Sequence, residues 1–223
     1  MKTTSKNKFA KNAVYAAVFY GLSIAAANAT IIQYSNRATF EAQGAIAENY
    51  GFEDWGSTGQ FSFPGDPYTA HGVTYTTNNN LIAKPDSGYG PASNVFLNNY
   101  WSPLPGSISG AYDMFGFDLG ILGTNSLIDF SVTTNIGTYN FNNVTVPNVN
   151  QRPGMTFFGF IADPGETFTG FNFVSQLGSG HAPALDNVTL GNRSNTVPEP
   201  ASLALLGIGL AGLGVARRRK ATT

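Results

Sequence analysis

The stretch Ser126–Thr133, SLIDFSVT, alternates apolar and polar side chains, and the same period of two runs through Thr167–Val174 and Gly72–Thr76. Successive side chains of a β-strand point to opposite faces of its sheet, so this period predicts antiparallel strands with one buried face. Similar short runs, separated by Gly, Pro, Asn and Asp, fill most of the middle of the chain and predict about ten strands.

One short helix is expected before these strands, because Asn36 can cap the segment Arg37–Gln43 and Gly44 can end it. No alternation of helix and strand follows, which argues against a parallel sheet. We therefore predict an all-β fold. It is an antiparallel β-sandwich of jelly-roll type with one short N-terminal helix and, at the other end of the chain, a C-terminal hydrophobic helix.

The 223-residue chain has a formal net charge of −1, but most of its basic residues lie at its two ends. Residues 30–197 carry four basic and twelve acidic side chains, a formal charge of −8. Such a body repels phosphate groups, so no nucleic-acid partner is expected. The chain has no Cys, which excludes disulfides, zinc–thiolate sites and cysteine nucleophiles.

Residues 1–29 have the features of a secretory signal peptide. Four lysines precede an apolar segment, Ala13–Ala26, and Ala27 and Ala29 supply the small residues at which signal peptidase cleaves. We expect cleavage after Ala29. An uncleaved membrane anchor is the alternative, but the apolar segment is short for a membrane span.

The C-terminal segment follows the predicted folded domain, residues 30–191, and a polar linker, residues 192–196. It consists of a Pro-Glu-Pro motif at residues 198–200, an uncharged segment, Leu203–Ala216, and a basic cluster at residues 217–220. At about 1.5 Å per residue, a helix over residues 203–216 makes a marginal membrane span. The basic cluster should stay on the cytoplasmic side, which predicts a transient inner-membrane association with the body outside.

Residues 197–222 resemble the PEP-CTERM sorting signal of Gram-negative bacteria, in which the same three parts follow in the same order. The resemblance implies that an integral-membrane exosortase recognises the signal and cleaves near its Pro-Glu-Pro motif. It also implies release to, or attachment at, the cell surface or the exopolysaccharide matrix. The implied recognition residues are Pro198, Glu199, Pro200, Arg217, Arg218 and Arg219.

Candidate catalytic residues are few. The segment Gly106–Gly110, GSISG, has Ile where a nucleophile elbow has its serine. His71 and His181 stand alone in the sequence, without metal-ligand spacing. We therefore expect no catalytic residue and no enzymatic activity in this chain.

Two carboxylates form the main candidate site. In the last predicted strand, Asp186 alternates in step with Val188 and Leu190, which places it on an apolar face where a carboxylate is costly unless its charge is compensated. The segments around Glu53 and Asp186 also resemble the first and last strands of carbohydrate-binding jelly rolls. This resemblance implies a structural calcium ion held by the two carboxylates, and no other cofactor is expected. The alternative is that Asp186 accepts hydrogen bonds from nearby backbone amides.

Four aromatic side chains in or beside predicted loops are candidate carbohydrate-binding residues: Trp55, Tyr89, Tyr100 and Trp101. Aromatic rings present an apolar face on which the C–H groups of a sugar can pack. The alternative is that these rings close the ends of the sandwich core.

The sequence thus predicts an exported, exosortase-sorted protein of the cell surface or extracellular matrix, whose body binds exopolysaccharide. A secreted polysaccharide-active hydrolase and a purely structural coat component are the alternatives. A hydrolase requires a cleft that holds two carboxyl groups, one of them with a raised pKa.

Overall fold

The computed structural model describes residues 30–194 apart from residues 57, 78, 86, 88–90, 92, 99–102, 124–125, 150–153 and 177–180. The predicted signal peptide (1–29) and the predicted sorting signal (197–222), with its hydrophobic helix, lie outside the described residues. None of the described helices is long and apolar enough to cross a membrane.

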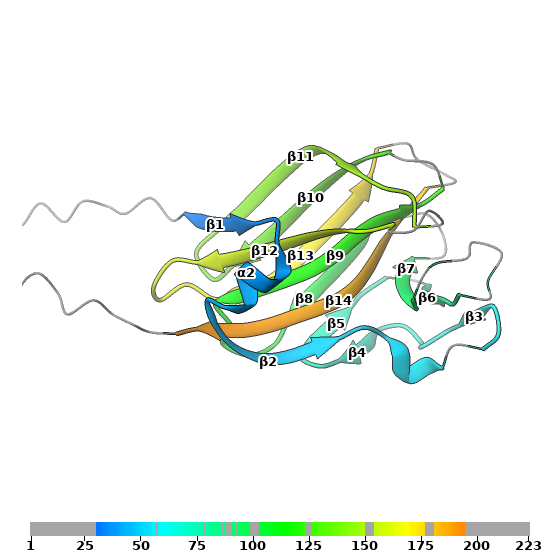
Figure 1. The fold of residues 1–223 in the computed structure, drawn as a ribbon, viewed down its shortest axis with the longest axis horizontal. Coiled ribbons are helices and arrows are strands. Elements are labelled where there is room, and N and C mark those ends of the chain that lie inside the picture. Colours follow the sequence, from blue (N-terminus) through cyan, green and yellow to red (C-terminus); the bar gives the residue numbers. More distant parts are fainter. Residues whose placement is uncertain are drawn as a thin grey trace, which may run out of the picture. The chain divides into compact units, whose positions relative to one another are not determined.

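The described chain forms two antiparallel sheets that pack face to face (Figure 1). The larger sheet has eight strands in the order β1-β12-β9-β14-β7-β6-β3, and β2 also pairs with β14. Their bounds are β1 (Ile31–Tyr34), β2 (Gly44–Tyr50), β3 (Phe61–Ser62), β6 (Asn80–Ala83), β7 (Val95–Asn98), β9 (Met114–Leu122), β12 (Thr156–Ala162) and β14 (Ala182–Arg193).

The smaller sheet has six strands in the order β11-β10-β13-β8-β5-β4. Their bounds are β4 (Tyr68–Ala70), β5 (Val73–Tyr75), β8 (Leu104–Ile108), β10 (Ser126–Thr134), β11 (Thr138–Val146) and β13 (Phe168–Ser175). Every strand pairing within the two sheets is antiparallel. These sheets confirm the predicted all-β sandwich, and β10, β13 and β5 confirm the three segments whose period of two predicted strands.

Strand β14 extends two residues past the expected domain boundary at residue 191. Asn192 and Arg193, expected in the linker, pair with Ala45 and Gly44 of β2. The last strand therefore contacts β9 along one edge and both β7 and β2 along the other.

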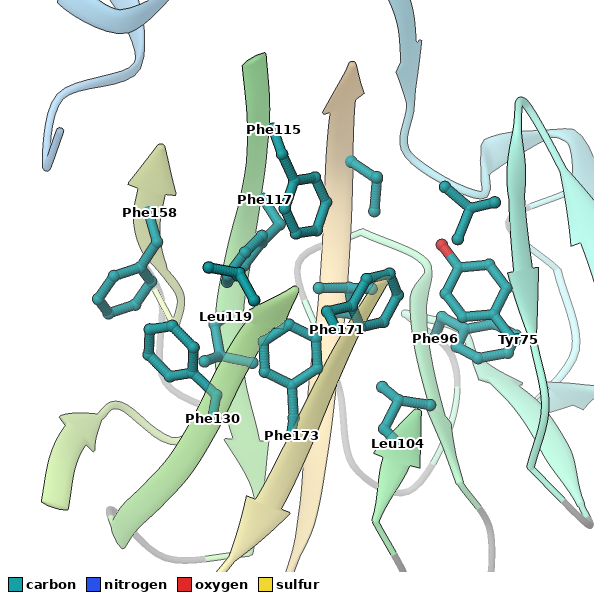
Figure 2. Close-up of a cluster of buried hydrophobic side chains, with 14 of the residues drawn as sticks. Tyr75, Phe96, Leu104, Phe115, Phe117, Leu119, Phe130, Phe158, Phe171 and Phe173 are labelled. Carbon is teal, nitrogen blue, oxygen red and sulfur yellow. The ribbon is translucent and has the colours of Figure 1, made fainter. Parts of the chain in front are cut away.

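The main core lies between the two sheets and is built largely from aromatic rings (Figure 2). Six phenylalanines that meet there, each at most 8% exposed, are Phe115, Phe117, Phe158, Phe130, Phe171 and Phe173. The ring of Phe117 meets that of Phe173 edge-on, with centroids 4.9 Å apart. Such edge-to-face pairs add to the free energy of burial, so the sandwich can be stable without disulfides.

Helix α2 (Arg37–Glu41) confirms the predicted N-terminal helix and covers part of the outer face of the eight-stranded sheet. Asn36 caps it, because its side chain accepts a hydrogen bond from the backbone N–H of Thr39 at 2.9 Å. The fully buried ring of Phe40 lies on the cross-strand pair Gly116 and Gly159. A Cβ atom at these positions would lie 2.9 Å and 2.7 Å from the Phe40 ring, so only glycine allows the ring to approach the sheet.

Two smaller apolar clusters lie on the same outer face. One contains Phe40, Met114, Phe157 and Ile161, and the other contains Leu81, Ala83, Val95, Leu97, Leu122, Val149, Ala182 and Ala184. A sheet covered on both faces does not alternate. This explains why all residues of β6 and β7 are buried, whereas β11 in the six-stranded sheet alternates along most of its length.

Candidate functional site

Asp186 lies at a β-bulge in strand β14. The register with β9 shifts between Asp186 and Thr189, and Asn187 has a left-handed backbone with a φ of 46°. The bulge reverses the alternation of side chains. Val188 and Leu190 therefore join the core between the sheets, whereas Asp186 lies on the outer side. The expectation that Asp186 shares a face with Val188 and Leu190 is thus wrong, although Asp186 is buried, with 1% exposure.

Two donors hold the carboxyl group of Asp186. Ser93 Oγ donates to Oδ2 at 2.5 Å, and the backbone N–H of Asn187 donates to Oδ1 at 2.7 Å. Burial raises the pKa of Asp186 to about 7, the carboxylates of Asp118 and Glu53 add to the rise, and the two hydrogen bonds oppose it. Near neutral pH, this group can therefore exist either as a hydrogen-bond-donating acid or as a carboxylate.

Asp118 of β9 is the direct cross-strand partner of Asp186. Its carboxylate accepts a hydrogen bond from Asn187 Nδ2 at 2.8 Å and forms an ion pair with Arg37 at 3.1 Å. The Arg37 guanidinium also lies over the ring of Phe157, 4.4 Å from its centroid. Helix α2 thus supplies one cation to a pair of carboxylates, and that cation is bound to Asp118.

These carboxyl groups line a pocket of about 290 Å³ on the outer side of the eight-stranded sheet. Its polar wall consists of Ser93, Asp118, Asp186 and Asn187, and its remaining wall consists of Pro91, Val95, Val149, Gly154, Met155 and Phe157. The volume is near the lower end of the range for ligand pockets, about 300–1,000 Å³. Convergent polar groups beside an apolar wall can bind a small polar molecule that also has an apolar face, such as one or two sugar units.

Glu53 begins the short 3₁₀ helix η1 (Glu53–Trp55) and contacts the same loop segment as Asp186. Glu53 Oε1 accepts a hydrogen bond from the N–H of Asn94 at 3.1 Å, and the neighbouring Ser93 donates to Asp186. The two predicted calcium ligands are therefore near enough for the charge of Glu53 to raise the pKa of Asp186. Within the described ranges, no three His, Cys, Asp or Glu residues are grouped to hold a metal ion. A calcium site at Glu53 and Asp186 stays a prediction.

Trp55 is half-buried and packs against the main core. Its Nε1–H donates to the hydroxyl group of Tyr68 at 3.2 Å, and the two rings meet edge-on with centroids 5.9 Å apart. These contacts are those expected of a ring that closes the core, and a carbohydrate-binding role for Trp55 stays a prediction. The other three aromatic candidates, Tyr89, Tyr100 and Trp101, lie outside the described residues, as do the six implied recognition residues of the sorting signal.

Asp118 and Arg37 are site residues that the sequence pattern did not identify. Asp118 is the only charged residue of β9, MFGFDLGIL, and this interruption of an apolar run is the signal that could have marked it. Its pairing with Asp186 depends on the register of two strands that lie far apart in the chain, which no local pattern reveals.

Comparison with known proteins identifies the C-terminal segment. The PEP-CTERM protein-sorting motif matches residues 196–220, which confirms the resemblance drawn from the Pro-Glu-Pro motif, the apolar segment and the arginine cluster. No curated protein matches the chain at a significant level.

Among solved structures, a mutant of the family 29 carbohydrate-binding module CBM29-2 is 12% identical with a TM-score of 0.35, and the match covers 61% of this chain and 94% of the module. Another family 29 carbohydrate-binding module has the same identity and TM-score, with 60% and 90% covered. The matched sorting motif indicates a protein that is exported and processed at its C-terminus.

Proposed function

We propose that this chain is an exosortase-sorted protein of the cell surface or extracellular matrix whose sandwich body binds exopolysaccharide in the Asp118–Asp186 pocket, without enzymatic activity. The motif at residues 196–220 supports the sorting step. Signal peptidase and an exosortase are then its processing partners, and its contact with the inner membrane is transient.

One observation supports the binding step above all: Asp186 is a buried carboxyl group that lines a pocket and has no cationic partner within the described part of the chain. Burying such a group is costly unless its hydrogen bonds are completed. Sugar hydroxyl groups can donate to the carboxylate and accept from the acid. The C–H face of the same sugar can pack on Met155 and Phe157.

The charge of the body restricts the kind of polysaccharide. Residues 30–197 carry a formal charge of −8, and two of their carboxyl groups, those of Asp118 and Asp186, line the pocket. A polymer rich in carboxylate or sulfate groups would be repelled. A neutral polysaccharide, or one that contains amino sugars, is the better match.

A glycan array with the full-length chain tests the binding step. We expect the wild-type chain to bind neutral or amino-sugar glycans, and Asp186→Asn to weaken that binding at least tenfold. The matched control is Asp54→Asn, which makes the same charge change at an exposed position of η1 and should bind like the wild type. Absence of any bound glycan, or equal binding by Asp186→Asn, would contradict the proposal.

The sorting step has a separate test. Glu199→Ala should leave unprocessed protein in the inner membrane, because the carboxylate of the recognition motif is lost, whereas Thr222→Ala should be processed normally. Mass spectrometry of the mature C-terminus is the measurement. If residues 203–220 remain on wild-type protein at the cell surface, the sorting proposal is wrong.

A second candidate function is favoured by the same pocket. Two carboxyl groups on adjacent strands, one with a pKa of about 7, could serve as a general acid and its partner in a polysaccharide-active hydrolase. Asp118, however, is already engaged by Arg37 and Asn187. Release of reducing sugar by the wild-type chain but not by Asp186→Asn would establish the hydrolase, and no release by either would favour binding alone.

A further inference from the structure

We infer that the outer face of the six-stranded sheet is a second binding surface, which takes an extended, uncharged polysaccharide chain along rows of hydroxyl and carboxamide groups. This surface belongs to the other sheet from the Asp118–Asp186 pocket. Its existence therefore does not depend on whether that pocket binds a sugar.

One row of side chains crosses all six strands at the same level and is called here the hydroxyl row. The strand registers place its members side by side in the order Thr138, Thr133, Gly170, Ser107, Thr74 and Thr69. Five of these six positions carry a hydroxyl group. The Oγ1 atoms of Thr133 and Thr138 lie 3.2 Å apart and those of Thr69 and Thr74 lie 2.9 Å apart, so each pair shares a face.

The hydroxyl row points away from the core. Val73, Ile108 and Val132 each follow or precede a member of the row in their strands, and all three are buried between the sheets. Alternation then directs their neighbours outward. With strands about 4.7–4.9 Å apart, the row extends over roughly 24 Å, and Gly170 is its one position without a hydroxyl group. An extended polymer with hydroxyl groups on every unit can follow such a row.

A second row lies next to the first on β11, β10 and β13 and consists of Asn140, Ser131 and Asn172. These residues, together with Asn142 and Asp129, line a hollow of about 120 Å³. The Oδ1 atom of Asn172 is buried there and has no hydrogen-bond donor among the residues that the structure describes. A buried acceptor without a protein donor is costly. A ligand hydroxyl that donates to Asn172 would remove that cost.

The charge of this face determines the class of ligand. Neither row contains a charged side chain. The acid in the hollow, Asp129, already accepts hydrogen bonds through Oδ1 from the N–H of Asn143 at 2.8 Å and from Gln176 Nε2 at 2.6 Å. The two rows therefore offer nothing to compensate a carboxylate or sulfate group, and their uncharged donors and acceptors match a neutral polysaccharide.

Binding at this surface should depend on chain length. A hydrogen bond between an exposed hydroxyl group and a sugar replaces bonds that both make to water, so each one adds little. Many such bonds along one polymer act together through a high effective concentration. Long chains should therefore bind, and short oligosaccharides of the same polymer should compete poorly.

Affinity electrophoresis of the full-length chain, in a detergent without a sugar headgroup, tests the surface. The gels contain dextran, hydroxyethylcellulose or galactomannan, and alginate serves as the anionic polymer. We expect at least one neutral polymer to retard the chain, and alginate not to. A triple variant, Thr74→Val, Thr133→Val and Thr138→Val, should bind at least tenfold more weakly. Valine keeps the shape and strand propensity of threonine.

Two further variants separate binding from folding. Asn172→Leu removes the unpaired acceptor, so it should melt no lower than the wild type while weakening retardation. Thr145→Val is the matched control, because it lies on the same strand as Thr138 but seven residues away, roughly 23 Å along the strand. It should be retarded like the wild type.

Three results would overturn the proposal that this face binds polysaccharide. They are no retardation by any neutral polymer, retardation by alginate equal to that by a neutral polymer, and retardation of the triple variant equal to that of the wild type. Retardation that Asp186→Asn abolishes and the triple variant keeps would also overturn it. That last result would leave the proposed pocket intact, so failure of the two sites can be told apart.

Discussion

The outer faces of the two sheets differ in what covers them and in what they can carry. Helix α2 and two apolar clusters cover much of the outer face of the eight-stranded sheet, and there the chain buries a carboxyl group beside a pocket. The outer face of the six-stranded sheet has no comparable cluster within the described residues and carries hydroxyl and carboxamide groups in register. A covered face can shift the pKa of an acid, whereas the exposed face presents mainly uncharged groups that water can solvate.

The first test of this difference concerns helix α2, which covers part of the outer face of the eight-stranded sheet. Phe40→Ala should lower the free energy of unfolding by about 3–5 kcal/mol, because it removes a fully buried ring and leaves a cavity over Gly116 and Gly159. Denaturant unfolding is the measurement. Phe63→Ala is the control, since Phe63 is 62% exposed and its loss should change little. Similar losses in the two variants would mean that α2 does not cover the sheet in solution.

The buried acid of the covered face predicts a pH dependence. The pKa of Asp186 is raised from 3.8 to about 7, so the folded state binds this proton more tightly than the unfolded state does. Its contribution to stability is therefore full below about pH 4, falls as the pH rises towards 7, and is lost above that, a change of about 4 kcal/mol at most.

Asp186→Asn isolates this contribution from those of the other acids. The melting temperature of Asp186→Asn relative to the wild type should rise between pH 5 and pH 8, because only the wild type ionises a buried group. Asp54→Asn, at an exposed position, should show no such trend. A difference between Asp186→Asn and the wild type that does not vary with pH would show that Asp186 does not titrate between pH 5 and pH 8, against a pKa of about 7.

Calcium binding beside the eight-stranded sheet would have a third and smaller effect on stability. If Glu53 and Asp186 hold a calcium ion, saturation at 100 times Kd should add about 2.7 kcal/mol to the free energy of unfolding. Thermal melts with calcium and with a chelator are the measurement. Identical melting temperatures across millimolar calcium would exclude the site, and a shift that persists in Asp186→Asn would place the ion elsewhere.

The smallest effect on stability is expected for a substitution on the outer face of the six-stranded sheet. Thr133→Val alone should change the free energy of unfolding by no more than about 0.5 kcal/mol, because the Thr133 hydroxyl group lies at the surface and valine suits a strand. Denaturant unfolding of this variant beside Phe40→Ala measures the contrast directly. A loss of several kcal/mol would mean that the hydroxyl row is a structural element of the fold.

The sequence predicted the exposed sheet better than the covered one. Ser126–Thr133 alternates because only one face of β10 is buried, so its period of two was readable. In β9 and β14 both faces are covered, and the run around Asp118 gives no period. The bulge at Asn187 reverses the alternation after Asp186, and a single extra residue of this kind leaves no clear trace in the sequence.

The candidate site was predictable only in part for the same reason. Glu53 and Asp186 were identified from their sequence context. Asp118 and Arg37 belong to the site only because strand register and the position of α2 bring them to Asp186. The sorting motif at residues 196–220 was readable in full, because a linear signal needs no tertiary structure to be recognised.

The most direct test of the binding proposal is the titration of Asp186 itself, followed by NMR of its carboxyl carbon with and without an oligosaccharide identified on the glycan array. The structure predicts a pKa of about 7 in the free chain and a clear shift of both pKa and resonance when the sugar binds. An Asp186 that titrates near 3.8 in the free chain, or a bound sugar that leaves its titration unchanged, would contradict the proposed site.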